Sequence, residues 1–414
     1  VLNDELQRSA TVTNTTVTMT GHAELHLTGT GDPLSGSTVH LNSEDAWVFL
    51  HAVQPSAAAG LLSHIRVNGA TAVLDSNVRI VQYVNGSVIV PHAPGFQPLT
   101  VFTGREFTGI PGKLNQYTAY GWQELGPFND SIRSFKLKRG YTATFAQNPN
   151  GTGISKNYVA QDADLEVSIL PTDLDKSISF VRVFPWRWIA KKGSCDIDPV
   201  ALNARWHYNW NNSLNSTRNW EYVPIKQQPW WPGIYSDYKV QGVNHVLHYN
   251  EPNNPVEDAY KNLHPQGSVS AAVAGLPELL GTGLRVGAPA VTDGGYGWIV
   301  DYVNQAKAAG HRLDYVPVHY YRAYWNQNDP AGAANDLYNF LKSIYDATGL
   351  PIWVTEFNNG ANWTNNAYDP SVDQNRNVIQ AMIQKMDETP WIERYAIYSR
   401  VEWFRQTHYD DGSI

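Results

Sequence analysis

Two glutamates, each at the end of an apolar run and each next to an asparagine or one residue from it, are the residues of this sequence best placed to do chemistry. Glu251 stands in Asn250-Glu251-Pro252 after an apolar run, and the proline stops a strand there. Glu356 lies 105 residues further on (356 − 251), in Thr355-Glu356-Phe357-Asn358. One carboxyl group that donates a proton and a second that attacks carbon or activates water are the minimum equipment for cleaving a glycosidic bond. The pair therefore predicts a glycosidase.

The elements that would position these residues follow a change of pattern after residue 184, where β runs begin to alternate with helical stretches. That alternation is typical of a (β/α)8 TIM barrel. Candidate strands lie at residues 188–193, 204–210, 220–225, 245–249, 285–288, 315–321, 352–356 and 395–399. Because the carboxyl ends of parallel strands meet at one rim, Glu251 after the fourth strand and Glu356 after the seventh should face each other across it.

Helical stretches separate mainly the later strands. They lie at residues 256–263, 268–276, 297–309, 331–348 and 371–389. Within the fourth, Leu337, Leu341 and Ile344 share one face at helical spacing. Between the first three strands there is hardly room for helices beyond a short one near 199–204, so we expect a short barrel with its early helices short or missing.

The N-terminal part is β throughout. Residues 1–96 alternate in the β manner, with a hairpin signal at Asn85-Gly86, and predict an all-β module of β-sandwich type. Between residues 97 and 186 a repeat of roughly 45 residues ends each time in an acidic turn and a strand, which indicates paired Greek keys. The expected domains are therefore 1–96, 97–186 and 187–414.

The composition favours a soluble protein that binds a neutral, hydroxyl-rich ligand. A net charge of −8 over 414 residues, without a long basic run, argues against nucleic acid as a partner. Fifteen Trp and 23 Tyr suit carbohydrate, because flat aromatic rings pack against the C–H faces of sugars. No run of about 18 apolar residues exists, so no membrane span is expected. Cys195 has no second cysteine with which to form a disulfide.

The turns of the 97–186 repeat carry a family resemblance. Asn129-Asp130-Ser131-Ile132-Arg133-Ser134 and Asp175-Lys176-Ser177-Ile178-Ser179 resemble the turns of the βγ-crystallins, where such turns can bind calcium through oxygen ligands. Here Arg133 replaces a ligating hydroxyl and Lys176 replaces an acid. Each puts a positive charge where the ion would sit, so the favoured interpretation is a plain β-domain, with structural calcium as the alternative.

Residues 187 to 414 resemble the retaining glycoside hydrolases of clan A. The resemblance rests on Asn250-Glu251-Pro252 and Thr355-Glu356-Phe357, which fall on the expected strands. Lys192-Gly193, Trp206-His207-Tyr208-Asn209-Trp210, His319-Tyr320-Tyr321 and the short barrel are most similar to glycoside hydrolase family 128, which acts on β-1,3-glucans.

The resemblance implies roles for individual residues. Glu251 would be the acid/base, with a raised pKa, and Glu356 the ionised nucleophile. Asn250 would hydrogen-bond the 2-hydroxyl of the sugar between them. His319 and Tyr321 are expected to hold Glu356 by a hydrogen bond. The mechanism needs no metal, and His245 and His248 should point to opposite faces of a strand, so they do not form a metal pair.

Several tryptophans are candidate sugar platforms. Trp230-Trp231 stands in a loop bounded by Pro232, at the expected barrel mouth. Trp210, Trp363 and Trp403 fall at strand ends or in the loops that follow, where burial in the core is the competing interpretation. Glu221 and Glu402 are further acids at the rim, without the flanking pattern of the first two.

The function expected is that of a monomeric, secreted, retaining endo-β-glycanase acting on β-1,3-glucan such as laminarin or curdlan. One alternative keeps the mechanism on another β-glycan such as agar. Another is a non-catalytic polysaccharide-binding protein, and a third is a calcium-stabilised structural protein. Secretion is expected because the Asn/Thr-rich start at Val1 resembles a mature end left by a signal peptide. The short stretch after the eighth strand, ending at Ile414, predicts a longer natural chain.

Overall fold

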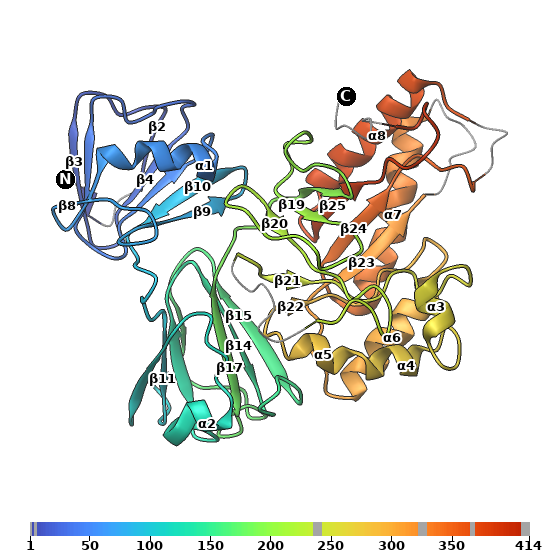
Figure 1. Ribbon diagram of the computed structural model, residues 1–414, viewed down its shortest axis with the longest axis horizontal. Coiled ribbons are helices and arrows are strands. Elements are labelled where there is room, and N and C mark those ends of the chain that lie inside the picture. Colours follow the sequence, from blue (N-terminus) through green and yellow to red (C-terminus); the bar gives the residue numbers. More distant parts are fainter. Residues whose placement is uncertain (1, 4–5, 235–241, 322–328, 365–368, 407–414) are drawn as a thin grey trace.

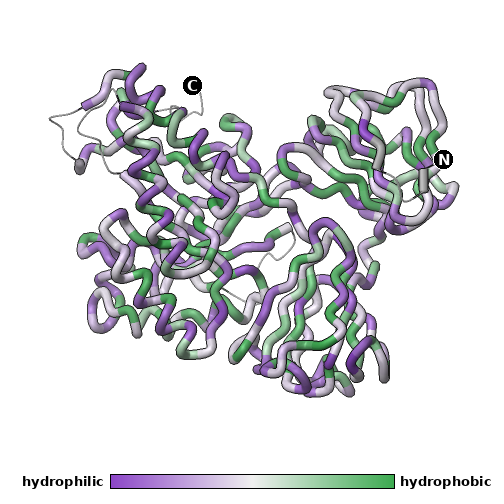
Figure 2. Tube along the Cα trace, turned by 180° about the vertical axis from the view of Figure 1, so that it is seen from behind, coloured by the Kyte–Doolittle hydropathy of each residue, from purple (hydrophilic) through white to green (hydrophobic). Residues whose placement is uncertain are grey.

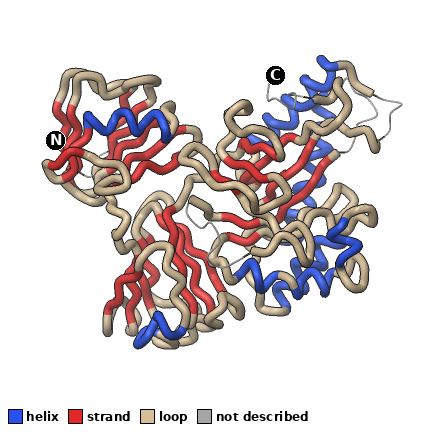
Figure 3. The backbone as a smooth tube through the Cα atoms, in the orientation of Figure 1, coloured by secondary structure: helices blue, strands red, loops and turns tan. Residues whose placement is uncertain are grey.

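The computed structural model describes residues 2–3, 6–234, 242–321, 329–364 and 369–406 (Figure 1). The chain end from 407 to 414, on which the expectation of a longer natural chain rests, lies outside these residues. Two β-rich regions precede a C-terminal region that holds all the long helices (Figure 3). None of the described helices combines the length and the apolar character that crossing a bilayer requires.

The first region is a short coil of parallel strands that alternate between two five-stranded sheets. One sheet runs β1-β3-β5-β7-β8 and the other β2-β4-β6-β10-β9, with parallel pairing along β1 to β7 and along β2 to β6. The strands are β1 Leu2–Asn3, β2 Leu6–Ser9, β3 Thr16–Thr20, β4 Glu24–Leu27, β5 Thr38–Leu41, β6 Trp47–Leu50, β7 Ile65–Val67, β8 Ala70–Thr71, β9 Arg79–Tyr83 and β10 Gly86–Val90, with the one-turn helix α1 Pro55–Ala58.

This arrangement differs from the expected β-sandwich in the direction of its strands. Two layers do face each other over one apolar core. Alternation of apolar and polar residues reads the same whether neighbouring strands run parallel or antiparallel, so the sequence pattern could not tell a coil from a sandwich. The hairpin expected at Asn85-Gly86 is confirmed as the antiparallel pair β9–β10.

The second region exchanges strands between its two halves. Its strands are β11 Leu99–Phe102, β12 Pro111–Leu114, β13 Ser134–Leu137, β14 Tyr141–Ala146, β15 Ser155–Ala160, β16 Leu165–Val167 and β17 Phe180–Pro185, with the one-turn helix α2 Trp122–Leu125. The sheets are β12-β11-β13-β16 and β15-β14-β17, all antiparallel. β16 of the second half joins the sheet of the first, and Tyr120 of the first half bridges Val181 in the sheet of the second. Each half therefore contributes residues to the sheet of the other half.

Eight parallel strands in the C-terminal region pair in sequence order. They are β18 Lys192–Cys195, β19 Trp206–Tyr208, β20 Glu221–Tyr222, β21 His245–Val246, β22 Arg285–Val286, β23 Val316–Tyr320, β24 Ile352–Phe357 and β25 Ile392–Ile397. Hydrogen-bonded pairs join the strands in the orders β20-β19-β18-β25-β24-β23 and β21-β22. The last strand, β25, pairs with the first, β18. The bridges Ile225↔Leu247 and Gly287↔Tyr315 supply the two remaining links, between β20 and β21 and between β22 and β23. All the carboxyl ends consequently lie at one edge.

Within the described residues, the helices of the C-terminal region follow β21 and the later strands. They are α3 Asp258–Asn262, α4 Val269–Ala274, α5 Leu276–Leu280, α6 Tyr296–Ala308, α7 Pro330–Thr348 and α8 Val372–Asp387. Leu337, Leu341 and Ile344 of α7 are fully buried, as their spacing predicts. Seen from behind in Figure 2, α7 and α8 alternate between hydrophilic and hydrophobic residues, as helices with one buried face do. The short helix expected near 199–204 is wrong: this described segment forms turns.

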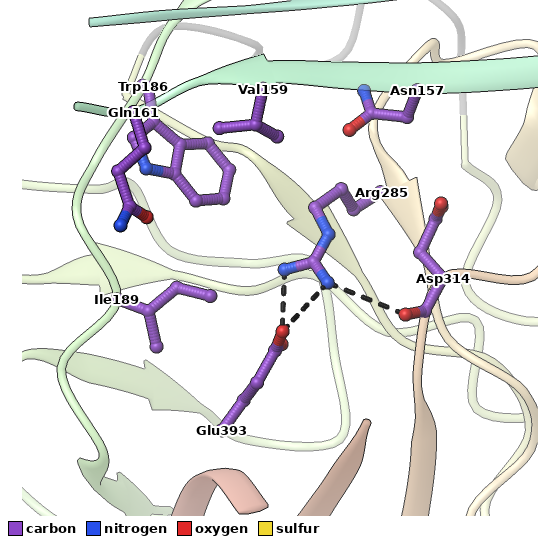
Figure 4. A pocket seen from close by; sticks show the side chains of 8 residues that line it. All are labelled: Asn157, Val159, Gln161, Trp186, Ile189, Arg285, Asp314 and Glu393. Atoms are coloured by element: carbon purple, nitrogen blue, oxygen red, sulfur yellow. Dashed lines mark hydrogen bonds and ion pairs between the residues drawn. The ribbon is translucent and has the colours of Figure 1, made fainter. Parts of the chain in front are cut away.

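The regions are joined by buried hydrogen bonds and line an open pocket between them. Arg182 of β17 donates to the Thr282 carbonyl (2.8 Å), and Thr144 of β14 donates to the Gly283 carbonyl (2.7 Å). A cavity of about 410 Å³ lies where β15 meets the starts of β22 and β25, with Arg285 paired to Glu393 in its wall (Figure 4). Because it adjoins the amino ends of the parallel strands, it is at the edge opposite their carboxyl ends.

Candidate active site

Glu251 and Glu356 reach the same edge of the eight strands. Glu356 is the last residue but one of β24. Glu251 follows Asn250, whose bridge to Ala290 extends the line of β21. One carboxylate oxygen of each glutamate and a ring nitrogen of His319, the last residue but one of β23, all lie within 4.8 Å of one another. The structure thus brings together two carboxylates that are distant in sequence.

Glu356 is buried and held by three donors. The Tyr321 hydroxyl donates to Oε2 at 2.5 Å, and Trp210 Nε1 donates to Oε1 at 2.9 Å. The Tyr208 hydroxyl also donates to Oε1, at 3.3 Å. Burial, together with the negative charge of Glu356, raises the pKa of both tyrosines well above the ordinary value, so both remain donors. Hydrogen bonds to a carboxylate stabilise its ionised form, which is the form a nucleophile needs.

Glu251 is held on both of its oxygens. His319 Nδ1 lies 2.6 Å from Oε1, and Asn254 Nδ2 donates to Oε2 at 2.7 Å. The backbone at Glu251 is left-handed (φ 45°), a conformation that residues other than glycine seldom adopt. Its N–H donates to the Ala290 carbonyl at 2.8 Å, which fixes this turn against the segment that follows β22. Backbone strain held in this way aims the carboxyl group into the edge of the ring of strands.

His319 stands between the two glutamates. It is 1% exposed, and its Nε2 lies 3.5 Å from Glu356 Oε1 without forming a hydrogen bond. We expected His319 to hold Glu356, but its hydrogen bond goes to Glu251. The expectation for Tyr321 agrees with its contact to Glu356. The histidine nitrogen and two carboxylates also form a group that could hold a divalent cation.

The charges around His319 reverse one expectation. Burial acts to raise the pKa of Glu251, but the hydrogen bond and charge of His319 outweigh it, and the net shift is downward rather than upward as expected. Burial likewise acts to lower the pKa of His319, but the charges of Glu356 and Glu251 raise it overall. Both shifts favour the ion pair between a charged His319 and an ionised Glu251.

Asn250 and Glu257 form the side of the site next to Glu251. Asn250 Nδ2 donates to Glu257 Oε2 at 3.4 Å, while its buried Oδ1 has no hydrogen-bond partner among the residues that the structure describes. Burial and the charges of Glu251 and Glu356 raise the pKa of Glu257. Glu257, Asn254 and Tyr208 were not predicted. Asn254 could have been noticed from the run Asn250 to Asn254, whereas nothing in the sequence places Glu257 beside Asn250.

Of the tryptophans predicted as sugar platforms, Trp210 is bonded to Glu356, whereas the other four expose a third or more of their surface. Trp210 is not free to act as a platform on its nitrogen edge, because its indole N–H is bonded to Glu356. Trp363 is 57% exposed, and its ring lies 5.0 Å from that of Tyr321, which places it next to the site. Trp230 and Trp231 are 66% and 36% exposed, in the loop that follows Gln227, the backbone partner of Asn250. Trp403 is 72% exposed and packs edge-on against Phe404.

Glu221, His245 of β21 and His248, two residues after the end of that strand, lie away from the two candidate catalytic glutamates. Glu221 is fully buried and pairs with His245 and Arg394, so it is not a rim acid. His245 faces Glu221 and Trp353 inside the ring, whereas His248 bonds Tyr302 of α6 outside it. The two imidazoles point to opposite sides of the strand.

Several solved structures match about half of this chain. A GH128 (subgroup I) endo-β-1,3-glucanase from Amycolatopsis mediterranei in complex with laminaritriose matches at 24% identity and a TM-score of 0.45, over 54% of this chain and 94% of its own. A subgroup II enzyme from Sorangium cellulosum matches at 21% and 0.41, over 54% and 94%. A subgroup V exo-β-1,3-glucanase from Cryptococcus neoformans matches at 18% and 0.42, over 54% and 95%. Likeness at this level carries no inference about individual residues.

No curated protein matches the sequence. The model of one protein family, described as glycosyl hydrolase catalytic core, matches residues 186–413, more than half of the chain. This stretch contains all eight strands of the ring, together with Glu251 and Glu356 at its carboxyl edge. The chain belongs to the glycosyl hydrolase catalytic core family.

Proposed function

We propose that this glycosyl hydrolase is a retaining endo-β-1,3-glucanase in which Glu356 is the nucleophile and Glu251 the acid/base. The observation that carries the proposal is the separation of the two carboxylates. One oxygen of each lies within 4.8 Å of the other. Retaining enzymes place these groups roughly 5–5.5 Å apart, whereas inverting enzymes need roughly 6.5–9.5 Å to admit a water molecule.

In the first step an oxygen of Glu356 attacks the anomeric carbon while Glu251 protonates the departing glycosidic oxygen. The three donors around Glu356 fix the orientation of its carboxyl group before attack. In the second step Glu251, now a carboxylate, takes a proton from water, which releases the sugar from Glu356. Asn250, next to Glu251, is assigned to bind a sugar hydroxyl, and its Oδ1, which no described residue hydrogen-bonds, supports this role.

The substrate class is proposed from the sequence resemblance to glycoside hydrolase family 128 and from the aromatic surface near the site. Trp363 packs against Tyr321, whose hydroxyl donates a hydrogen bond to Glu356, and more than half of the Trp363 side chain is exposed. Such a ring suits the C–H face of a neutral glucan. Endo rather than exo action, secretion and a monomeric state stay predictions from the sequence.

We also propose two assignments of fold. The ring of eight parallel strands would be a (β/α)8 barrel shortened at its first three units, and the region 97–186 a βγ-crystallin-like domain. The first is supported by the return of β25 to β18, and the second by the exchange of strands between its halves. Domain boundaries at 96 and 186 stay predictions.

The proposal is tested by reducing-sugar release from laminarin, curdlan, agarose, xylan, mannan and cellulose. Wild-type protein is compared with Glu251→Gln and Glu356→Gln. We expect cleavage of laminarin or curdlan, with losses of several orders of magnitude in both variants. If a different glycan is cleaved and both variants lose the same activity, the proposed substrate is wrong but the proposed mechanism stands. Binding without cleavage of any glycan would favour the polysaccharide-binding alternative, which the intact pair of glutamates otherwise speaks against.

A further inference from the structure

Three side chains of the site also form a candidate ligand set for a cation. Among the residues that the structure describes, only Glu251, His319 and Glu356 bring three carboxylate or imidazole ligand atoms within 4.8 Å of one another. The side chains of the three residues are 12%, 1% and 8% exposed, so the group is nearly buried. The proposed reaction uses the two glutamates without a metal, and it leaves this second chemical capacity of the group unused.

His319 offers one ring nitrogen that no described residue hydrogen-bonds. Its Nδ1 lies 2.6 Å from Glu251 Oε1, whereas its Nε2 is buried and has no hydrogen-bond partner within the described part of the chain. A histidine that ligates a metal through one nitrogen commonly donates the N–H of the other to a carboxylate, which fixes the ring and makes the ligating nitrogen more basic. Glu251 is placed to accept that N–H, so Nε2 is the nitrogen left for a cation.

The separation between His319 and Glu356 suits an ion shared by the two. Nε2 of His319 lies 3.5 Å from Glu356 Oε1. Two ligands at zinc bond lengths of about 2.0–2.2 Å and at a tetrahedral angle lie about 3.4 Å apart. The carboxylate is itself fixed, because Tyr321 donates to Oε2 at 2.5 Å and Trp210 donates to Oε1 at 2.9 Å. Outer hydrogen bonds of this kind orient a ligating carboxylate, so a cation needs little movement of either ligand.

The charges and ligand types of the group favour a particular class of ion. Two carboxylates face one imidazole, so a charged ring balances at most one of the two negative charges that the glutamates can carry. A dication balances both, and it takes the place of any proton on Nε2. An imidazole together with carboxylates suits Zn²⁺ and Cu²⁺, whereas Mg²⁺ and Ca²⁺ prefer oxygen ligands alone.

We propose that His319 Nε2 and Glu356 Oε1 bind a zinc-class cation when no sugar occupies the site, with Glu251 as the carboxylate behind His319, and that this cation inhibits the enzyme. A Glu356 that ligates the ion cannot attack the anomeric carbon, so the ion and the glucan exclude each other. Binding of the ion is independent of the proposed function. Inhibition rests on that function, because it assumes that Glu356 is the nucleophile.

Calorimetric titration of the metal-free full chain with zinc chloride measures the binding. Glu251→Gln keeps both ligands but removes the carboxylate behind His319, and it should weaken zinc binding roughly 10- to 100-fold. His319→Gln removes the nitrogen ligand and should weaken binding further. His22→Gln is the matched control, because it removes an imidazole whose side chain is 62% exposed in the first region. It should bind zinc as wild type does.

Equal zinc affinity in wild type and His319→Gln would overturn the metal site, as would a loss in His22→Gln alone, which would reveal an adventitious surface site. A measurement on wild type guards against a variant that does not fold. In nitrogen-15 NMR, zinc should shift the Nε2 resonance of His319 while Nδ1 keeps its proton. An Nε2 resonance that saturating zinc leaves unchanged would also overturn the site.

Inhibition is measured by the cleavage of laminarin in the presence of Zn²⁺ or Mg²⁺. We expect Zn²⁺ to raise KM without changing kcat, as a competitor of the glucan does, and Mg²⁺ at the same concentration to change neither. Zinc that binds at His319 but leaves KM unchanged would overturn the proposed inhibition. If laminarin is not cleaved at all, the proposed function fails, and the calorimetric titration still decides whether the metal site exists.

Discussion

At the scale of single residues, the site is defined by which oxygen each donor reaches. Glu356 receives three hydrogen bonds, from Tyr208, Trp210 and Tyr321, and Glu251 receives two, from His319 and Asn254. Two chemically identical side chains thus have different partners: phenol and indole groups surround Glu356, whereas an imidazole and an amide hold Glu251. Differences of environment of this kind are what assign acid and nucleophile to a pair of carboxylates.

Trp210→Phe tests whether this tryptophan acts through its indole N–H or through its ring. The substitution keeps an aromatic face but removes the 2.9 Å hydrogen bond to Glu356. A hydrogen bond to a charged group contributes about 1.5–3 kcal/mol, so we expect kcat to fall by roughly 10- to 100-fold. Steady-state kinetics on laminarin measures it.

Trp122→Phe is the matched control, because Trp122 lies exposed on α2 in another region of the molecule. Its kinetics should equal those of wild type. A change confined to KM in Trp210→Phe, with kcat unaltered, would show that the ring binds sugar and that the N–H does not matter for Glu356.

At the scale of elements, charged residues inside the ring of strands join β20, β21 and β25. Glu221 accepts from His245 Nδ1 at 3.0 Å and from Arg394 at 2.7 Å, and all three side chains are buried. Burial acts to raise the pKa of Glu221, but the charges of His245 and Arg394 lower it overall. The carboxylate is therefore ionised in the folded protein.

Glu221→Gln should destabilise the protein by about 3–5 kcal/mol at pH 7, because it leaves Arg394 buried without its countercharge. Since the folded pKa of Glu221 lies below its ordinary value of 4.5, the difference from wild type should be full above that pH and shrink as pH falls below it. Urea unfolding followed by tryptophan fluorescence at pH 7 and pH 3.5 measures it. The exposed Glu388→Gln is the control, and an equal loss there would contradict the explanation.

The two turns that resemble βγ-crystallin calcium sites are joined by an ion pair instead. Arg133 of the first turn forms a two-pronged contact with Asp175 of the second, at 2.9 and 3.0 Å, and Arg105 adds a third hydrogen bond at 2.7 Å. The hydrogen bond from Arg133 lowers the pKa of Asp175 to about 2. The arginine that departs from the calcium-binding pattern thus supplies the positive charge itself.

Arg133→Met should lower the melting temperature at pH 6, and adding calcium or a chelator should change neither protein. Asp175 has a folded pKa below its ordinary value, so the difference between variant and wild type should diminish as pH falls toward 2. Differential scanning calorimetry at both pH values measures it. Stabilisation of the wild type by calcium would contradict this account and restore the calcium interpretation.

These elements also show what a sequence can and cannot reveal. The long helices α6, α7 and α8 were predicted to within two residues, because their periodic apolar faces are local features. The direction of strands β1 to β7 was not, because the pattern is the same for either direction. Partners were least predictable: whether His319 bonds Glu251 or Glu356 depends on distances across the ring that no local pattern contains.

At the scale of the whole molecule, catalytic and supporting functions fall on opposite edges of the strands. The carboxyl edge carries Glu251, Glu356 and the exposed Trp363, whereas β14 and β17 of the second region bond to the segment before β22, at the amino edge. The second region therefore supports the C-terminal region at the edge opposite Glu251 and Glu356. Specificity for one glycan would then depend on the loops at the carboxyl edge.

The most direct test of the central claim is the anomeric configuration of the glycosyl azide formed by Glu251→Ala from a 2,4-dinitrophenyl β-laminarioligoside in the presence of azide. Without its acid/base, the enzyme should still form the covalent intermediate on Glu356, and azide should replace water in releasing it. The account predicts that azide speeds the turnover of Glu251→Ala relative to the same variant without azide, and that proton NMR shows a β-glycosyl azide as the product. An α-glycosyl azide, or no azide product, would contradict the assignment of Glu356 as nucleophile and Glu251 as acid/base.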